Sequence, residues 1–156
     1  MQAPAASIVA VLAVHAAAAK HPDKMGMTPL HCGMENQAPA KGIAAVLAAN
    51  PAAAKHPDKH GMTPLHHGMH KRAPADSIVA LMAAFPAAAE QPDKDGKLPL
   101  HHGICRCRQA PAESIVAVAA AFPAAANHPD EYGKLRPHHG WRSEPQPRSE
   151  PVMIPI

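Results

Sequence analysis

The sequence predicts an all-α fold in which helix-turn-helix units stack into a solenoid. The first observation is a repeated four-residue motif. It reads TPLH at residues 28–31 and 63–66, LPLH at 98–101 and LRPH at 135–138, so successive copies are 35, 35 and 37 residues apart. The second is a proline at two fixed places in the first two blocks, directly after Thr and directly after Ala, which is typical of helix N-termini. The third is an apolar stripe at helical spacing in the second part of each block.

The repeat divides the chain into blocks. Those beginning at Asp23 and Asp58 are identical at 22 of 35 positions, which chance does not give. We expect a half-repeat with only a second helix (1–22), repeats at 23–57, 58–92 and 93–129, a degenerate terminal half-repeat (130–140) and a Pro-rich disordered tail (141–156). The two extra residues of the 93–129 repeat fall near ICRCRQ, so the insertion is expected in the loop between its helices.

Each block contains signals for two helices and a turn. In the first, Thr28 precedes Pro29, which predicts an N-cap followed by a proline in the first helical position. Gly33 and the polar MENQ stretch are expected to end this helix, and Ala38-Pro39 predicts a second one running to about Asn50. The second helices share an apolar stripe: Ile43, Val46 and Leu47, then Ile78, Leu81 and Met82, then Ile115 and Val118. Pro51, Pro86 and Pro123 are expected to close these helices, and segments such as HPDKHG supply turns.

With its TPLH motif and its period, the sequence resembles the ankyrin repeat family over roughly residues 23–139. The resemblance implies turn-tipped helix pairs in which the motif His joins a hydrogen-bond network around the Thr cap. The implied motif residues are Thr28, Pro29, Leu30, His31, Thr63, Pro64, Leu65, His66, Pro99, Leu100 and His101.

The sequence departs from the family pattern at several positions. Gly33, Gly68 and Gly103 stand where the family prefers Ala, which predicts a loss of up to about 1 kcal/mol of helix propensity each. Leu98 replaces the capping Thr, and we expect it to be only partly buried, so that Leu98→Thr would stabilise the protein. The array is therefore expected to be weakly held.

The first 20 residues have two readings. Their apolar run and small residues are compatible with a secretory signal, but they lack a basic n-region. QAPAASIVAV at 2–11 matches QAPAESIVAV at 109–118 in nine of ten positions. Periodicity therefore favours the half-repeat.

Thirteen histidines and three cysteines raise the question of a metal site. Ten of the histidines fall at repeated positions, and equivalent residues of stacked repeats stand roughly 8–10 Å apart, too far for two ligands of one zinc ion. Cys105 and Cys107 form a CxC without the second pair of a structural zinc site. We therefore expect no metal and no cofactor, while a His/Cys metal-binding or redox module stays open as an alternative.

No motif predicts catalysis. The sequence contains no glycine-rich phosphate loop, GxSxG or HExxH, and Ser7, Ser77 and Ser114 sit at matching places at helix starts. No pair of carboxylates stands apart from the repeat to act as acid and base. We expect that the protein is not an enzyme.

The predicted function is the binding of another protein. The resemblance implies that turn tips and the exposed side of the first helix line a concave surface, with Met34, Glu35, Met69, His70 and Ile104 as first-helix candidates. The tip candidates are Lys24, Met25, Met27, Lys59, His60, Met62, Lys94, Asp95, Lys97, Glu131, Tyr132 and Lys134. Their lysines favour a partner with an acidic surface.

Charge and cysteine content bound the remaining possibilities. A formal charge of +3 is too mild for a dedicated nucleic-acid binder, and no apolar run reaches the roughly 20 residues of a membrane span. We expect no nucleic acid, membrane or small-molecule substrate as partner. An odd number of cysteines favours the cytoplasm or nucleus over secretion. A structural fragment of a longer repeat protein, with no partner of its own, stays open as a second alternative.

Overall fold

The computed structural model describes residues 21–104 and 110–127, and these residues are all-helical, with no strand among them. The elements in chain order are α2 (Pro29–Glu35), α3 (Ala40–Ala49), η2 (Pro51–Lys55), α4 (Pro64–Lys71), α5 (Ala75–Ala84), η3 (Pro86–Glu90), α6 (Pro99–Gly103), α7 (Ala112–Ala121) and η4 (Pro123–Asn127), where η marks a 3-10 helix. No helix in the described part is long and apolar enough to span a membrane. The expected half-repeats, the CxC insertion, the tail and the candidates Glu131, Tyr132 and Lys134 lie outside the described residues.

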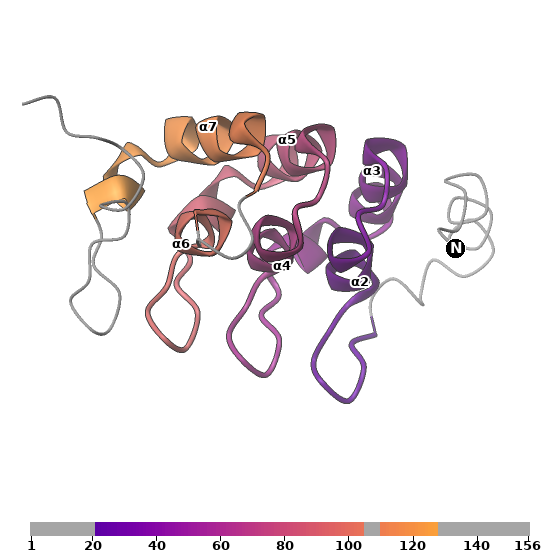
Figure 1. Cartoon of the computed structure of the whole chain (residues 1–156). Coiled ribbons are helices and arrows are strands. Elements are labelled where there is room, and N and C mark those ends of the chain that lie inside the picture. The colour runs from indigo at the N-terminus through magenta and orange to yellow at the C-terminus, as the bar shows by residue number, and fades with distance from the viewer. Residues whose placement is uncertain (1–20, 105–109, 128–156) are drawn as a thin grey trace, which may run out of the picture.

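The helices form two rows. α2, α4 and α6 pack on one another in chain order, and α3, α5 and α7 do the same beside them. Three loops project from the first row to the same side of the molecule (Figure 1). Each of these α-helices therefore has its equivalent in the adjacent block as its main neighbour.

The predicted N-terminal signals of the first helices are confirmed. Thr28 and Thr63 are the N-caps of α2 and α4, with extended backbones, and proline follows each. The second helices begin one residue later than predicted, because Pro39 is the N-cap of α3 and Ala40 its first helical residue. The same offset holds for Pro74 and Pro111 at α5 and α7.

The predicted apolar stripe forms the core between the two rows. Ile43, Val46 and Leu47 are buried, and the matching residues of α5 and α7 are buried too, except Ile115, which is half-buried. The PAAA segments were not assigned a structure from the sequence, and they form the 3-10 helices. Two alanines of each of η2 and η3 are buried, namely Ala53, Ala54, Ala88 and Ala89.

The helical glycines have a packing role that the sequence did not reveal. Gly33 and Gly68 lie inside α2 and α4, so the expectation that Gly33 ends its helix is wrong. A Cβ on Gly68 would overlap the terminal methyl of Met34, and one on Gly103 that of Met69. Glycine thus makes room for a fully buried methionine from the preceding block, which offsets the lost helix propensity.

Leu98 corrects another expectation. It is 1% exposed, not partly buried, and its backbone N–H donates to His101 Nδ1 at 2.9 Å without help from a hydroxyl. Burying a Leu side chain contributes about 1.5–3 kcal/mol, whereas a side-chain cap contributes about 0.5–2 kcal/mol. Leu98→Thr should therefore destabilise the protein by about 1 kcal/mol. Equilibrium urea unfolding checks this result, and a more stable variant would contradict it.

Ser77 and Ser114 occupy equivalent positions but differ in their contacts. The Ser77 hydroxyl donates to the Ala38 carbonyl of the preceding block at 2.8 Å, whereas the Ser114 hydroxyl is buried with no partner in the described part of the chain. Ser77→Ala should cost about 1–2 kcal/mol because it leaves a buried carbonyl unpaired. Ser114→Ala should be neutral or slightly stabilising, because it removes an unsatisfied group. Thermal unfolding of the two variants compares them, and equal effects would refute the distinction.

Candidate protein-interaction surface

The three described turn tips are built in the same way. In the first, Asp23 Oδ1 accepts the N–H groups of Met25 and Met27 at 2.8 and 2.9 Å. Asp58 and Asp93 do the same for their own tips. Gly26, Gly61 and Gly96 follow with φ of 79°, 78° and 68°, a conformation that favours glycine. Each tip is thus fixed by its own side-chain and backbone bonds.

Neighbouring tips are also bonded to one another. Lys59 N–H donates to the Met25 carbonyl at 3.0 Å, and Lys94 N–H donates to the His60 carbonyl at 3.1 Å. A Cβ on Gly61 would come within 2.8 Å of the Lys94 nitrogen, so the tips approach too closely for any other residue there. These bonds link the three tips into one rigid edge, and the loops lie side by side in Figure 1.

The motif histidines join each helix start to the next tip. His31 Nδ1 lies 3.0 Å from the Thr28 nitrogen and 2.9 Å from its hydroxyl, while Nε2 lies 3.1 Å from the Met62 carbonyl. Since a carbonyl only accepts, Nε2 carries the hydrogen and Nδ1 accepts from both Thr28 groups. His66 repeats the arrangement with Thr63 and Lys97. The predicted histidine network around the Thr cap is confirmed.

Burial keeps these imidazoles neutral. Desolvation lowers the pKa of His31 and of His66 to about 4, although the bond to the carbonyl of the next tip acts in the opposite direction. Both residues are fully buried. They act in the structure as neutral connectors between blocks.

The tip candidates divide into exposed and half-buried residues. Lys24, Met25, Lys59, His60, Lys94 and Asp95 are exposed, and Met27, Met62 and Lys97 are half-buried. Lys97 Nζ pairs with Asp95 at 2.8 Å, so these two charges largely cancel. Among the described residues Lys24, Lys59 and Lys94 form no ion pair. One lysine per tip therefore presents its charge to solvent.

Two of the first-helix candidates are wrong. Met34 and Met69 are 0% exposed and belong to the core, because each fills the space above a glycine of the next block. Glu35, His70 and Ile104 are partly exposed, as expected. Glu35 pairs with Lys71 of the next block at 2.8 Å. The first-helix face is thus less apolar than the sequence suggested.

A pair of side chains that the sequence analysis missed lies behind each of two tips. His67 Nε2 lies 3.0 Å from Asp58 Oδ2, and His102 Nε2 lies 2.8 Å from Asp93 Oδ2. Burial alone would raise the pKa of both carboxyls, but the hydrogen bonds from the histidines and the tip N–H groups hold it below its usual value. The signal was present in the sequence as an Asp followed by a His nine residues later in both blocks.

His66, Asp93 and His102 approach one another closely enough to suggest metal ligation, with one ligand atom of each within 4.8 Å of the others. His66 does not fit this role. Its Nδ1 faces the Thr63 N–H, so the hydrogen must sit on Nε2, where it donates to the Lys97 carbonyl. No lone pair of His66 is left for a metal, and the three residues form a hydrogen-bond network.

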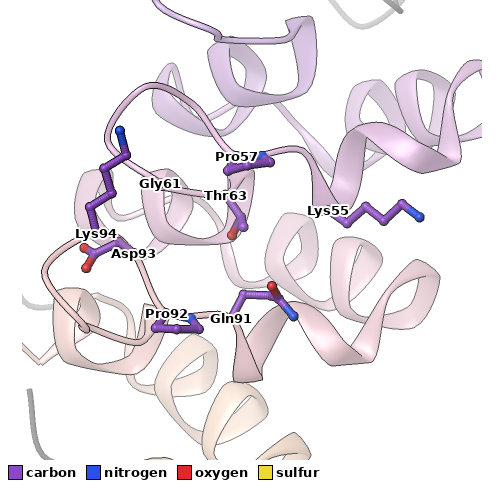
Figure 2. A pocket seen from close by; sticks show the side chains of 8 residues that line it. All are labelled: Lys55, Pro57, Gly61, Thr63, Gln91, Pro92, Asp93 and Lys94. Atoms are coloured by element: carbon purple, nitrogen blue, oxygen red, sulfur yellow. The ribbon is translucent and has the colours of Figure 1, made fainter.

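A hollow of about 320 Å³ lies between the second and third tips (Figure 2). It is lined by Lys55, Pro57, Gly61, Thr63, Gln91, Pro92, Asp93 and Lys94. The carboxyl of Asp93 is already bonded to its own tip and to His102, and the Thr63 hydroxyl to His66. The hollow adjoins the exposed Lys94 of the third tip.

No protein-family model matches the sequence, and no curated protein matches it either.

Proposed function

We propose that this chain is a noncatalytic, ankyrin-like repeat module that binds another protein through its turn tips and the adjoining side of its first helices. The observation that carries the proposal is the rigid edge of three tips, each presenting one unpaired lysine: Lys24, Lys59 and Lys94. Because the tips are already ordered, a partner does not bear the entropic cost of ordering them.

The charge of the edge favours a partner with acidic residues. The tip carboxylates of Asp58 and Asp93 are 3% exposed and bonded to backbone N–H groups and histidines, so they do not offset the lysines toward solvent. Met25 adds an apolar contact beside Lys24, since it is 48% exposed. Acidic side chains around a small apolar anchor would complement this edge.

The chemistry of the described residues supports a noncatalytic role. His31, His66 and Ser77 are engaged in bonds to neighbouring blocks. Asp58 and Asp93 are engaged in bonds within their own tips and to His67 and His102. The odd number of cysteines in the sequence fits the cytoplasm or nucleus, which we include in the proposal.

Charge reversal at the edge tests the proposal. Lys59→Glu with Lys94→Glu should weaken binding to a captured partner at least tenfold at low salt, and by less at high salt, because exposed charges are screened. The matched control is Lys41→Glu with Arg72→Glu, which changes the net charge equally at exposed cations outside the three tips and the hollow. Surface plasmon resonance on the two double variants and the parent measures the dissociation constants.

The affinities of the two double variants distinguish binding through the tips from binding through net charge or another surface. Loss of binding in the tip variant alone supports the edge as the binding surface. Equal affinities in both double variants would overturn it, because net charge or another surface would then govern the interaction.

A further inference from the structure

We propose that His70 and His102 together bind a transition-metal dication such as Zn²⁺ or Ni²⁺ at the junction of α4 and α6, with Asp93 as the residue that orients His102. Water, or a group from a binding partner, would complete the coordination. This site is separate from the tip lysines and does not depend on the proposed function.

His102 is held in the form that can ligate a metal. Its Nε2 lies 2.8 Å from Asp93 Oδ2, and the Asp93 side chain is 3% exposed. Asp93 Oδ1 accepts the N–H groups of Asp95 and Lys97 at 2.9 Å each, so the carboxylate is fixed in direction. An ionised carboxylate only accepts, which places the hydrogen on Nε2 and the lone pair on Nδ1. Metal-ligating histidines in proteins commonly donate their other N–H to a carboxylate in this way.

His70 supplies the second imidazole. It lies four residues after His66 on α4, and its ring centre is 5.8 Å from that of His102 with the planes at 80°. A tetrahedral ion about 2.0–2.1 Å from one nitrogen of each ring places the ring centres roughly 5 Å apart. The observed separation of the ring centres is thus within about 1 Å of the separation that one shared ion requires. His70 and His102 are both partly exposed, so an ion can reach them.

The equivalent junction of α2 and α4 lacks this pair of histidines. Asp58 and His67 repeat the carboxylate–imidazole contact at 3.0 Å, but Glu35 stands at the position of His70 and pairs with Lys71. His67 Nδ1 is also buried, and it has no hydrogen-bond partner within the described residues. The two junctions thus form a natural comparison within one molecule, with two accessible imidazoles only at the second.

Zinc titration of the full chain tests the site. The titration uses protein without an affinity tag in which Cys32→Ser, Cys105→Ser and Cys107→Ser remove the competing thiols. Isothermal titration calorimetry should show that His70→Ala and His70→Glu each weaken Zn²⁺ binding at least tenfold. Asp93→Asn should weaken it about 10-fold to 100-fold, as loss of a supporting carboxylate does elsewhere. His67→Ala is the matched control and should leave the affinity unchanged.

Nitrogen-15 spectra of the histidine rings identify the ligating atoms. Zn²⁺ should shift Nδ1 of His102 and one nitrogen of His70, while the rings of His31 and His66 keep their signals. Unchanged affinity in His70→Ala, which is partly exposed and should stay folded, would overturn the proposal. So would a zinc-induced shift confined to histidines other than His70 and His102.

Discussion

Lowering the pH from 7.5 to 5 should destabilise the protein by about 4 kcal/mol through His31 and His66 together. Both side chains have a pKa of about 4 in the folded protein, mainly because burial disfavours the charged imidazole. An unfolded histidine has a pKa of about 6.5, so the unfolded chain binds more protons between pH 6.5 and 4. Stability from these residues is fully present above pH 6.5 and is lost as the pH falls toward 4.

The tip aspartates lose their contribution to stability in a different pH range. Asp58 and Asp93 have a lowered pKa, so their contribution is present above the unfolded value of 3.8 and declines only at lower pH. Of these four groups, His31 and His66 should therefore account for most of the change in the free energy of unfolding between pH 7.5 and 5.

Urea unfolding at a series of pH values measures the effect. Replacing both histidines with Gln removes the titrating groups, and the dependence on pH between 7.5 and 5 should then become much flatter than in the parent. A parent protein whose free energy of unfolding is constant over this range would refute the prediction.

His66→Ala should destabilise the protein by about 3–5 kcal/mol, the range of large substitutions in a core. It removes a fully buried side chain whose ring bonds to the Thr63 nitrogen, the Thr63 hydroxyl and the Lys97 carbonyl. The buried groups left without a partner each cost about 1–3 kcal/mol, and a cavity adds to this. The second and third tips would also lose one of the bonds between their blocks.

Two further variants separate the causes. His66→Phe keeps most of the volume but makes none of the bonds, so it should recover only part of the loss. His60→Ala, at an exposed tip position, should change the free energy of unfolding by less than about 0.5 kcal/mol. Chemical denaturation followed by circular dichroism measures all three, and a His66→Phe protein as stable as the parent would show that packing alone matters at this position.

The candidate surface was predictable where it depends on the repeat. Lys24, Lys59 and Lys94 recur at the spacing of 35, and the structure places all three on exposed tips. The pairing of Lys97 with Asp95 and the contacts of the tip aspartates with His67 and His102 depend on side-chain orientation. The spacing of nine residues between Asp and His marks the second set of contacts, but residue types alone do not give the orientation of the side chains.

The sequence by itself determined the α-helices, their order and, to within one residue, their starts, because these depend on local chemistry. A Thr-Pro pair caps a helix and a stripe at i, i+3 and i+4 buries one face, whatever the neighbouring block contains. The first helices, and the buried stripes of the second helices, therefore lie at the positions predicted from the sequence.

Only the tertiary structure decided which of several similar residues are buried and bonded. Met34 lies in the core because Gly68 of the next block leaves space for it, and Leu98 is buried because neighbouring elements close over it. Ser77 reaches a carbonyl of the preceding block, whereas Ser114, after a two-residue insertion, does not. In each case the outcome is fixed by an atom from elsewhere in the chain, and a local pattern cannot report the distance to that atom.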